Sequence, residues 1–196
     1  MIHTTTLNGL SIQTGDILCM AFDQDENSRP GDYWRILGML IPGEVDHVAV
    51  YVGPGGRCVE AGGRGVIAFD LDGELWAAEK MFKHRGRFKD HLVGVAYPLQ
   101  GLDIPEERQI RIRNSVAEYC LSQVGKPYNI NFLNPDREEA FYCSQLAYKA
   151  YLPYGINLNT NRGVPNLPGS SSIVFPQEIW SGYPHKRSSR KKTNCD

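Results

Sequence analysis

Three short strand-like segments, separated by glycine-rich breaks, lie between residues 47 and 70 and constrain the fold more than any other stretch. Residues 47–52 (HVAVYV) and 57–61 (RCVEA) are rich in β-branched or apolar side chains and flank the turn GPGG. Residues 66–70 (VIAFD) follow a second turn, GGRG. Strands joined by such short turns form antiparallel hairpins. We therefore expect an antiparallel sheet.

The register of the first hairpin places a histidine and a glutamate on one face of the sheet. With residues 54–55 at the centre of the turn, His47 faces Gly62, and Glu60 lies diagonally next to His47, with backbones roughly 7–8 Å apart. A slip of one residue would separate the two side chains. Glu60 has apolar neighbours, and a carboxylate there is costly without a partner such as a histidine N–H. We predict a His47–Glu60 pair; the alternatives are an exposed charge at Glu60 and a purely structural His47.

A single cysteine stands at the expected start of an amphipathic helix. Residues 140–151 (AFYCSQLAYKAY) combine an aromatic approach with helical spacing, and Cys143 lies near their beginning. The N–H groups and dipole at a helix start favour a thiolate, and a histidine base makes a thiolate a catalytic nucleophile. A buried cysteine is more commonly a small hydrophobic residue, but polar residues follow Cys143 directly. Cys143 is therefore the candidate nucleophile and His47 the candidate base.

The remaining cysteines do not indicate a second site. They are Cys19, Cys58, Cys120 and Cys195. Cys19 and Cys120 fall in apolar segments, Cys58 lies on an expected strand, and Cys195 is close to the C-terminus. No two cysteines have zinc-ligand spacing, and an odd number in a chain of 196 residues argues against a disulfide scaffold. No metal site is expected.

The rest of the chain fits one α+β domain. Residues 33–41 and 74–82 are expected to form short helices, and residues 105–124 a longer one. In the longer helix the apolar stripe consists of Ile110, Ala117, Cys120, Leu121 and Val124. A chain of this length buries one core. We predict one domain over residues 1–180 and a basic, flexible tail over residues 181–196.

The net charge argues against general binding to nucleic acid or membranes. The net charge of −1 gives no overall attraction to nucleic acid or membranes. Five cations at residues 186–192 (KRSSRKK) make the tail basic; it is read first as solvated, with weak contact to an anionic surface as the alternative. No secretory signal and no run of roughly 18–20 apolar residues is visible. We expect a soluble, cytoplasmic protein, although a chain whose signal had been removed would look the same.

Four motifs in a fixed order resemble the circularly permuted NlpC/P60 papain-like proteins, and among them the YiiX/YaeF-like group. They are GDIL at residues 15–18, DHVAVYVG at 46–53, VEA at 59–61 and YCSQL at 142–146. Further support comes from GKPY at residues 125–128 and FPQEI at 175–179. The resemblance spans residues 14–180 and implies a papain-like domain, with an antiparallel sheet or small barrel packed against helices.

The resemblance also implies a function and a set of site residues. By this match Cys143 is the nucleophile, His47 the general base and Glu60 the group that orients the imidazole. The expected enzyme cleaves an amide in a small peptide or lipid-type substrate through a thioester, without a metal or organic cofactor. The Cys143 N–H is the expected oxyanion donor. The residues expected in the wall of the substrate site are Asp16, Tyr128 and Tyr142.

Two alternatives remain open. A lipid acyltransferase or esterase of related permuted fold would transfer the acyl group to an amine rather than to water. The acyltransferases typified by lecithin–retinol acyltransferase carry an Asn-Cys-Glu-His type motif, and YCSQ at residues 142–145 departs from it, which disfavours that reaction. A non-catalytic module that binds a peptide or lipid is the second alternative. Its weakness is that binding alone needs no nucleophile–base pair.

Overall fold

The computed structural model of the protein describes residues 1–22, 42–87, 89–166 and 168–189. The short helix expected at residues 33–41 and the tail beyond residue 189 therefore lie outside the described residues.

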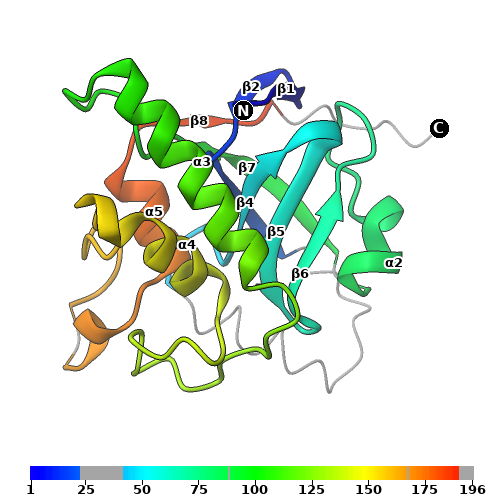
Figure 1. The fold of residues 1–196 in the computed structure, drawn as a ribbon. Coiled ribbons are helices and arrows are strands. Elements are labelled where there is room, and N and C mark those ends of the chain that lie inside the picture. Colours follow the sequence, from blue (N-terminus) through cyan, green and yellow to red (C-terminus); the bar gives the residue numbers. More distant parts are fainter. Residues whose placement is uncertain (23–41, 88, 167, 190–196) are drawn as a thin grey trace.

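Six strands form one antiparallel sheet in the order β6-β5-β4-β3-β7-β8 (Figure 1). They are β3 (Ile17–Phe22), β4 (His47–Gly53), β5 (Arg57–Gly62), β6 (Gly65–Asp70), β7 (Asp90–Ala96) and β8 (His185–Arg187). A separate hairpin, which the sequence analysis did not foresee, consists of β1 (Thr4–Leu7) and β2 (Leu10–Gln13). The described strands form an open sheet with β6 and β8 at its edges, so the antiparallel sheet is confirmed and the small-barrel alternative is not adopted.

The helices complete the predicted α+β class. They are α2 (Phe82–Arg85), α3 (Glu106–Ser122), α4 (Cys143–Tyr151) and α5 (Pro176–Gly182), with 3₁₀ turns η1 (Pro54–Gly56), η2 (Ala78–Met81), η3 (Leu152–Tyr154) and η4 (Ser170–Ser172). None of the helices in the described residues is long and apolar enough to cross a membrane.

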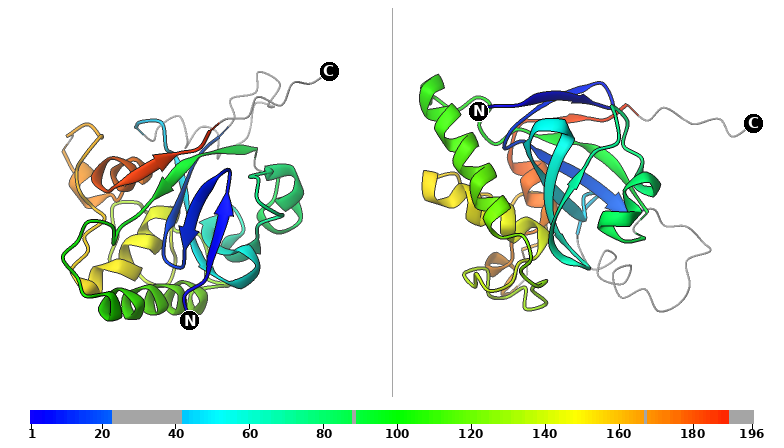
Figure 2. Two further views of the ribbon diagram at one scale, coloured as in Figure 1. Left: turned by 90° about the horizontal axis from the view of Figure 1, so that it is seen from above. Right: turned by 45° about the vertical axis from the view of Figure 1, so that its right-hand side comes forward.

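Alternate residues of the central strands point into two hydrophobic clusters. Val48 and Val50 of β4 pack with residues of α3 and α4, and both helices lie on the same side of the sheet (Figures 1 and 2). Ala49 and Tyr51 pack with the β1–β2 hairpin. Because successive side chains of a strand point to opposite faces, β4 is buried on both sides. His47, the first residue of β4, therefore lies on a strand that is packed on both faces.

The predicted register of the β4–β5 hairpin is correct where it decides the site. Val50 pairs with Val59, which is the register that places His47 and Glu60 on one face. Nearer the turn the register shifts by one residue, because the turn is the 3₁₀ turn η1 rather than a two-residue turn. The extra residue is absorbed as a bulge, and the pairing near the site is unchanged.

Helix α3 lies where it was predicted, but its buried face differs. The buried side chains are Ile112, Arg113, Val116, Ala117 and Cys120. Ile110, Leu121 and Val124, which were expected in the apolar stripe, are 40%, 40% and 44% exposed. The prediction counted only apolar residues, whereas Arg113 is buried because it forms an ion pair with Asp16 at 2.8 Å. A charged residue therefore occupies part of the packed face.

The prediction of a helix at residues 74–82 is wrong. Only η2 and the single turn α2 form near there, and α2 is followed by Gly86, which has a φ of 87°. The backbone N–H of Trp76 donates to Asn8 at 2.8 Å, and its indole N–H contacts Asp90 at 3.2 Å. These tertiary hydrogen bonds hold the segment before η2 in a non-helical connection.

The sheet continues beyond residue 180, into the segment expected to be a tail. Strand β8 pairs with β7, and Arg187 forms an ion pair with Glu44 at 2.5 Å and lies over the Trp180 ring. The strand was not foreseen because its three residues are exposed and polar and carry no hydrophobic signal. Part of the predicted basic charge is thus used inside the fold.

The loop that leads to α4 is attached to the β5–β6 hairpin. The Val66 N–H donates to the Lys126 carbonyl at 2.8 Å, and the Gly125 N–H donates to the Val66 carbonyl at 2.9 Å. Gly65 has a φ of 79°, and a Cβ at this position would collide with the Lys126 carbonyl oxygen; glycine permits both the backbone conformation and the close approach. The hairpin that carries Glu60 therefore also positions the approach to Cys143.

Candidate active site

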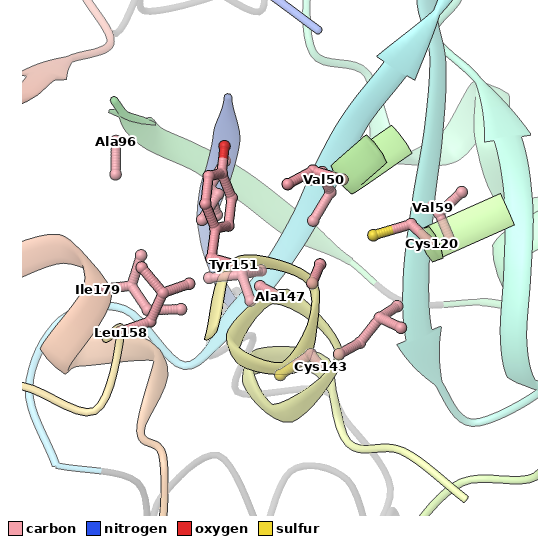
Figure 3. Packing of buried hydrophobic residues seen from close by; sticks show 14 of the residues in the cluster. Val50, Val59, Ala96, Cys120, Cys143, Ala147, Tyr151, Leu158 and Ile179 are labelled. Atoms are coloured by element: carbon pink, nitrogen blue, oxygen red, sulfur yellow. The ribbon is translucent and has the colours of Figure 1, made fainter. Parts of the chain in front are cut away.

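Cys143 is the first residue of α4 (Figure 3). Tyr142 before it has extended backbone angles, with φ −97° and ψ 166°, so the helix begins at the cysteine as predicted. Cys143 is 7% exposed and packs against the cluster between the sheet and the helices. Its position gives the thiol the positive end of the helix dipole.

Gln145 fastens the surrounding loop to the start of this helix. Its Oε1 accepts hydrogen bonds from the Tyr142 N–H at 3.2 Å and from Asn129 Nδ2 at 3.0 Å. Its Nε2 donates to the carbonyls of Pro135 and Arg137 at 3.0 and 2.7 Å. Because one buried amide satisfies four partners, Gln145 fixes both the helix start and the loop that precedes it.

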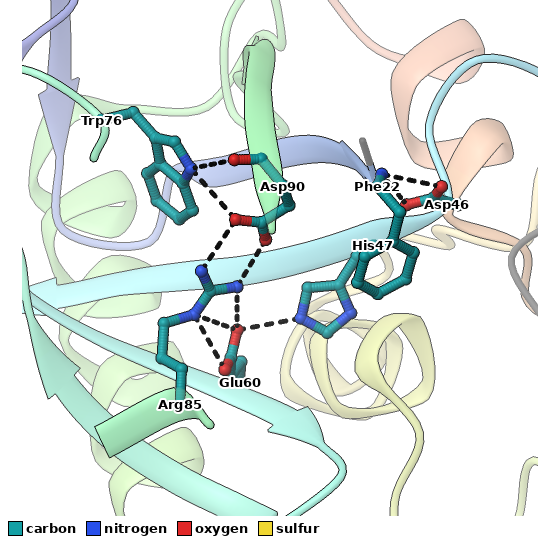
Figure 4. Close-up of polar contacts among 7 residues, drawn as sticks. All are labelled: Phe22, Asp46, His47, Glu60, Trp76, Arg85 and Asp90. Carbon is teal, nitrogen blue, oxygen red and sulfur yellow. Dashed lines mark hydrogen bonds and ion pairs between the residues drawn. The ribbon is translucent and has the colours of Figure 1, made fainter. Parts of the chain in front are cut away.

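His47 and Glu60 form the contact that the strand register predicts. They are 8% and 2% exposed, and His47 Nε2 lies 2.9 Å from Glu60 Oε2 (Figure 4). An ionised carboxylate can only accept, so Nε2 carries a proton and Nδ1 is the other nitrogen of the ring. Gly62 lies against both groups: a Cβ there would be 3.8 Å from Glu60 Oε1 and 4.0 Å from His47 Cε1. The exposed-charge alternative for Glu60 is therefore wrong.

The Cys143 thiol interacts with the His47 imidazole. Burial disfavours the charged imidazole, but the charge of Cys143 as a thiolate, a side-chain hydrogen bond to Cys143 and the contact with Glu60 outweigh burial. Together they raise the pKa of His47 well above its usual value. The fold thus brings three residues from β4, β5 and α4 together, and the arrangement suits a thiolate–imidazolium pair.

An arginine and an aspartate that the sequence analysis did not single out continue this network (Figure 4). Arg85 ends α2 and Asp90 opens β7, and they are 2% and 4% exposed. The guanidinium of Arg85 donates to Glu60 at 2.9–3.1 Å and to Asp90 at 2.7–3.0 Å. It also lies over the rings of Phe69 and Trp76, 5.0 and 4.9 Å from their centroids. The network therefore extends from β4 through β5 and α2 to β7.

The sequence contains little that could have identified these two residues. Residues 83–90 form a charged run, and such a run does not distinguish a buried arginine from solvated ones. The available signal is indirect: a buried glutamate is costly, and one histidine leaves part of that cost uncompensated. A search for a nearby cation would then have reached Arg85.

The charges of the network determine how its members ionise. Burial would raise the pKa of Glu60, but the charge of Arg85 and the contacts with His47 and Arg85 lower it from 4.5 to about 2. Burial likewise opposes the charge of Arg85, and Glu60 and Asp90 overcome it, so that the pKa of Arg85 is raised. Next to His47, burial raises the pKa of Asp46 to about 6, although the Phe22 N–H and the charge of His47 oppose it.

Two of the three expected wall residues, Tyr142 and Tyr128, lie in or beside the segment that leads to Cys143, since Tyr128 forms a β-bridge with Phe141. Tyr142 adjoins Cys143, and its hydroxyl accepts a hydrogen bond from the Val174 N–H at 3.1 Å. The ring of Phe132 contacts those of Tyr142 and Tyr128, with centroid distances of 5.3 and 6.3 Å. These three rings form an aromatic group that includes the residue directly before α4.

The third expected wall residue, Asp16, is placed in a different network. It is 2% exposed, accepts a hydrogen bond from the Gln13 N–H at 2.8 Å and forms the ion pair with Arg113. Its described contacts join the turn before β3 to α3 and do not connect it with Cys143. The sequence motif at residues 15–18 thus coincides with a structural ion pair.

The other described cysteines lie in the core. Cys19, Cys58 and Cys120 are free and buried, and burial raises the pKa of all three thiols, that of Cys120 to about 12. Cys195 lies outside the described residues. Within those residues, no group of three or more His, Cys, Asp or Glu side chains is arranged to hold a metal ion.

The sequence matches a known protein family, and the chain is similar to a solved structure. The family described as "Permuted papain-like amidase enzyme, YaeF/YiiX, C92 family" matches residues 12–167. None of the curated proteins matches. Among solved structures, the chain is similar to the metalloprotein yiiX from Escherichia coli O157:H7, with 15% identity over 91% of this chain and 97% of that chain and a TM-score of 0.47. The residues that match the family, 12–167, include Cys143, His47 and Glu60.

Proposed function

The chain belongs to the permuted papain-like amidase family YaeF/YiiX, and we propose that it hydrolyses an amide bond through a thioester on Cys143. His47 acts as the general base, and Glu60 positions the imidazole. The observation that carries the proposal is the buried hydrogen bond between His47 Nε2 and Glu60 Oε2, with the thiol at the start of α4 interacting with the same ring. This contact fixes the ring orientation and leaves Nδ1 for proton transfer.

The reaction proceeds in two balanced steps. The Cys143 thiolate attacks the amide carbonyl carbon, and the N–H of Cys143, at a helix end that lacks intrahelical acceptors, stabilises the oxyanion. His47 gives its Nδ1 proton to the leaving nitrogen, the C–N bond breaks, and the acyl group remains on sulfur. Water then gives a proton to His47 and attacks the thioester, which releases the carboxylic acid and restores the ion pair. Glu60 stays ionised throughout and holds the ring.

The substrate is proposed to be a small peptide or a lipid-type amide. An observation favours including lipids: Ile130 and Leu133 are 69% and 64% exposed, on the loop that carries Phe132 beside Tyr142. Exposed apolar side chains on a loop that contacts the residue before the nucleophile suit an acyl chain. Transfer of that acyl group to an amine instead of water is the second candidate reaction.

Thiol reactivity tests the nucleophile without any substrate. In a Cys195→Ser background, the alkylation rate of Cys143 by iodoacetamide is measured from pH 4 to 9, with the modified peptide identified by mass spectrometry. We expect rapid alkylation below neutral pH and a fall of at least about tenfold at pH 6 in His47→Ala, because an isolated thiol is mostly protonated there. A rate that rises only near ~8.5 and does not respond to His47→Ala would refute the proposal.

A panel of peptide amides and long-chain acyl amides then tests the reaction. We expect release of the free acid by the wild type and none by Cys143→Ala. Hydroxylamine is added to intercept the thioester as a hydroxamate, and a competing amine reports acyl transfer. Amide cleavage that persists in Cys143→Ala would exclude the thioester mechanism, and preferential formation of the new amide would establish the transferase alternative.

A further inference from the structure

Glu60 lies between His47 and Arg85. Arg85, which is farther from the reacting atoms, makes more hydrogen bonds to Glu60 than His47 does. Arg85 Nε contacts Glu60 Oε1 and Oε2 at 3.0 and 3.1 Å, and Arg85 Nη2 contacts Oε2 at 2.9 Å. His47 contacts Oε2 alone. A bidentate guanidinium fixes both the position and the plane of a carboxylate. The direction in which Glu60 points at His47 is thus set largely by Arg85.

Arg85 is itself held from the opposite side. Asp90 accepts from Arg85 Nη1 at 3.0 Å and from Nη2 at 2.7 Å, and Trp76 Nε1 donates to Asp90 Oδ1 at 3.2 Å. The guanidinium plane is also covered by the Phe69 and Trp76 rings. Arg85 therefore has a fixed orientation before any substrate arrives, which is the property that a positioning group requires.

The charges of the cluster do not balance until His47 is protonated. Two carboxylates, Glu60 and Asp90, share the single guanidinium of Arg85, and all three side chains are at most 2% exposed. One negative charge remains, and the imidazolium of His47 neutralises it. Because unpaired charges are costly in a buried site, the cluster favours the protonated histidine that a thiolate needs as its partner.

From these contacts we propose that Arg85 is a positioning residue of the active site: it keeps Glu60 ionised and directed at His47, and Asp90 holds Arg85 in place. The role assigned to His47 rests on the proposed amidase function. The effect of Arg85 on Glu60 rests only on their contacts, and the two parts can be tested separately.

The charged or titratable groups around this cluster come from several elements. Glu60 faces His47 from β4, Arg85 from α2 and Cys58 on its own strand, with Asp90 of β7 behind Arg85. His47 faces Cys143 from α4 and Asp46 on its own chain, and His91 of β7 acts on Asp46. Among these, Arg85 is the cation that contacts the Glu60 carboxylate from the side opposite His47.

The ionisation of Glu60 is measured directly by carbon-13 NMR of its labelled side-chain carboxylate between pH 2 and 7. In the wild type we expect it to remain ionised to below pH 3, in agreement with its pKa of about 2. In Arg85→Gln we expect a midpoint above 4.5, because burial then acts without its main opponent. Arg85→Lys keeps the charge but loses the bidentate geometry, so its midpoint should lie between the other two.

Arg113→Gln is the matched control, because Arg113 is 8% exposed and forms a comparable buried pair with Asp16. It should leave the Glu60 titration at its wild-type position. If Arg85→Gln does not fold, Arg85→Lys decides the question. A folded variant at residue 85 whose Glu60 titrates as in the wild type, or a wild-type midpoint near 4.5, would overturn the proposal.

The consequence for the active site is read from Cys143 alkylation at pH 5 and pH 8.5. In Arg85→Gln we expect the rate at pH 5 to fall about tenfold or more, since one pKa unit corresponds to a factor of ten. The rate at pH 8.5 should change far less, which general loss of structure would not produce. If the wild type itself shows no histidine-dependent reactivity, the amidase function fails, while the Glu60 titration still decides the role of Arg85.

Discussion

Replacing Glu60 by glutamine keeps the size of the side chain and removes one charge from the buried network. The wild-type carboxylate has its pKa lowered from 4.5 to about 2 by Arg85 and His47 against the effect of burial. This gap of roughly 2.5 units corresponds to about 3 kcal/mol of stability, at about 1.4 kcal/mol per unit. Glutamine also points an N–H₂ group at one of its two basic neighbours. We therefore expect Glu60→Gln to be less stable by about 3 kcal/mol at pH 7.

The pH dependence gives this prediction its sign. Because the folded pKa of Glu60 is depressed, its contribution to stability is present above 4.5 and is lost as the pH falls through about 2. The difference between wild type and Glu60→Gln should therefore shrink to about 1 kcal/mol at pH 3. Urea unfolding of both proteins at pH 7, 5 and 3 measures this difference.

Glu178→Gln is a suitable control. Glu178 is fully buried and accepts hydrogen bonds from the N–H groups of Phe175 and Asn161, but burial raises its pKa. Its ionised form therefore costs stability above that pKa, and the cost is relieved as the pH falls, so the pH trend should be opposite to that of Glu60→Gln. A stability difference for Glu60→Gln that is absent at pH 7, or equally large at pH 3, would refute the reasoning.

Two further changes test how the loop before α4 is held. Gly65→Ala should lower the free energy of unfolding by about 1–3 kcal/mol, because its φ is 79° and the new Cβ would meet the Lys126 carbonyl; Gly73→Ala, with a φ of 82° and open space around it, should cost less in the same thermal melt. Equal costs would mean that the contact with Lys126 is unimportant. Gln145→Ala removes three hydrogen bonds from the loop and one from the start of α4, so limited proteolysis should cut between residues 129 and 137 several times faster than in the wild type; an unchanged rate would argue against the anchoring role of Gln145.

The strands β4, β5 and β6 and the His47–Glu60 contact could be predicted because both depend on local rules. Strand-like segments with glycine breaks specify hairpins, and the register of one hairpin decides which side chains share a face. The partnership of Cys143 with His47 is different, since the two residues are almost a hundred positions apart and their pairing was inferred from the chemistry of a thiol at a helix start and a histidine on a strand, and then from resemblance to a family. Helical spacing located the start of α4 and could not indicate what the thiol would face.

The features that the sequence did not predict depend on buried charged residues. Arg113 lies in the packed face of α3, so an apolar count placed Ile110 wrongly on that face. Arg85 and Asp90 stand in a charged run whose burial follows only from their contacts in three dimensions. In each case a polar residue is buried because a distant partner compensates its charge, and sequence periodicity does not report such partners.

The short strand β8 affects whether the sheet can pair with other molecules. It covers β7 through the pairs that Gly94, Val95 and Ala96 make with residues 185–187, and Asn8 and Ser188 join the flanking segments by a hydrogen bond of 2.8 Å. A chain shortened to end before residue 185 would leave β7 as a bare edge, and bare edges pair with other molecules. Because the His47–Glu60 contact lies on β4 and β5, with β3 between them and β7, such a chain should self-associate while keeping that contact. We therefore expect β8 to protect the protein against aggregation.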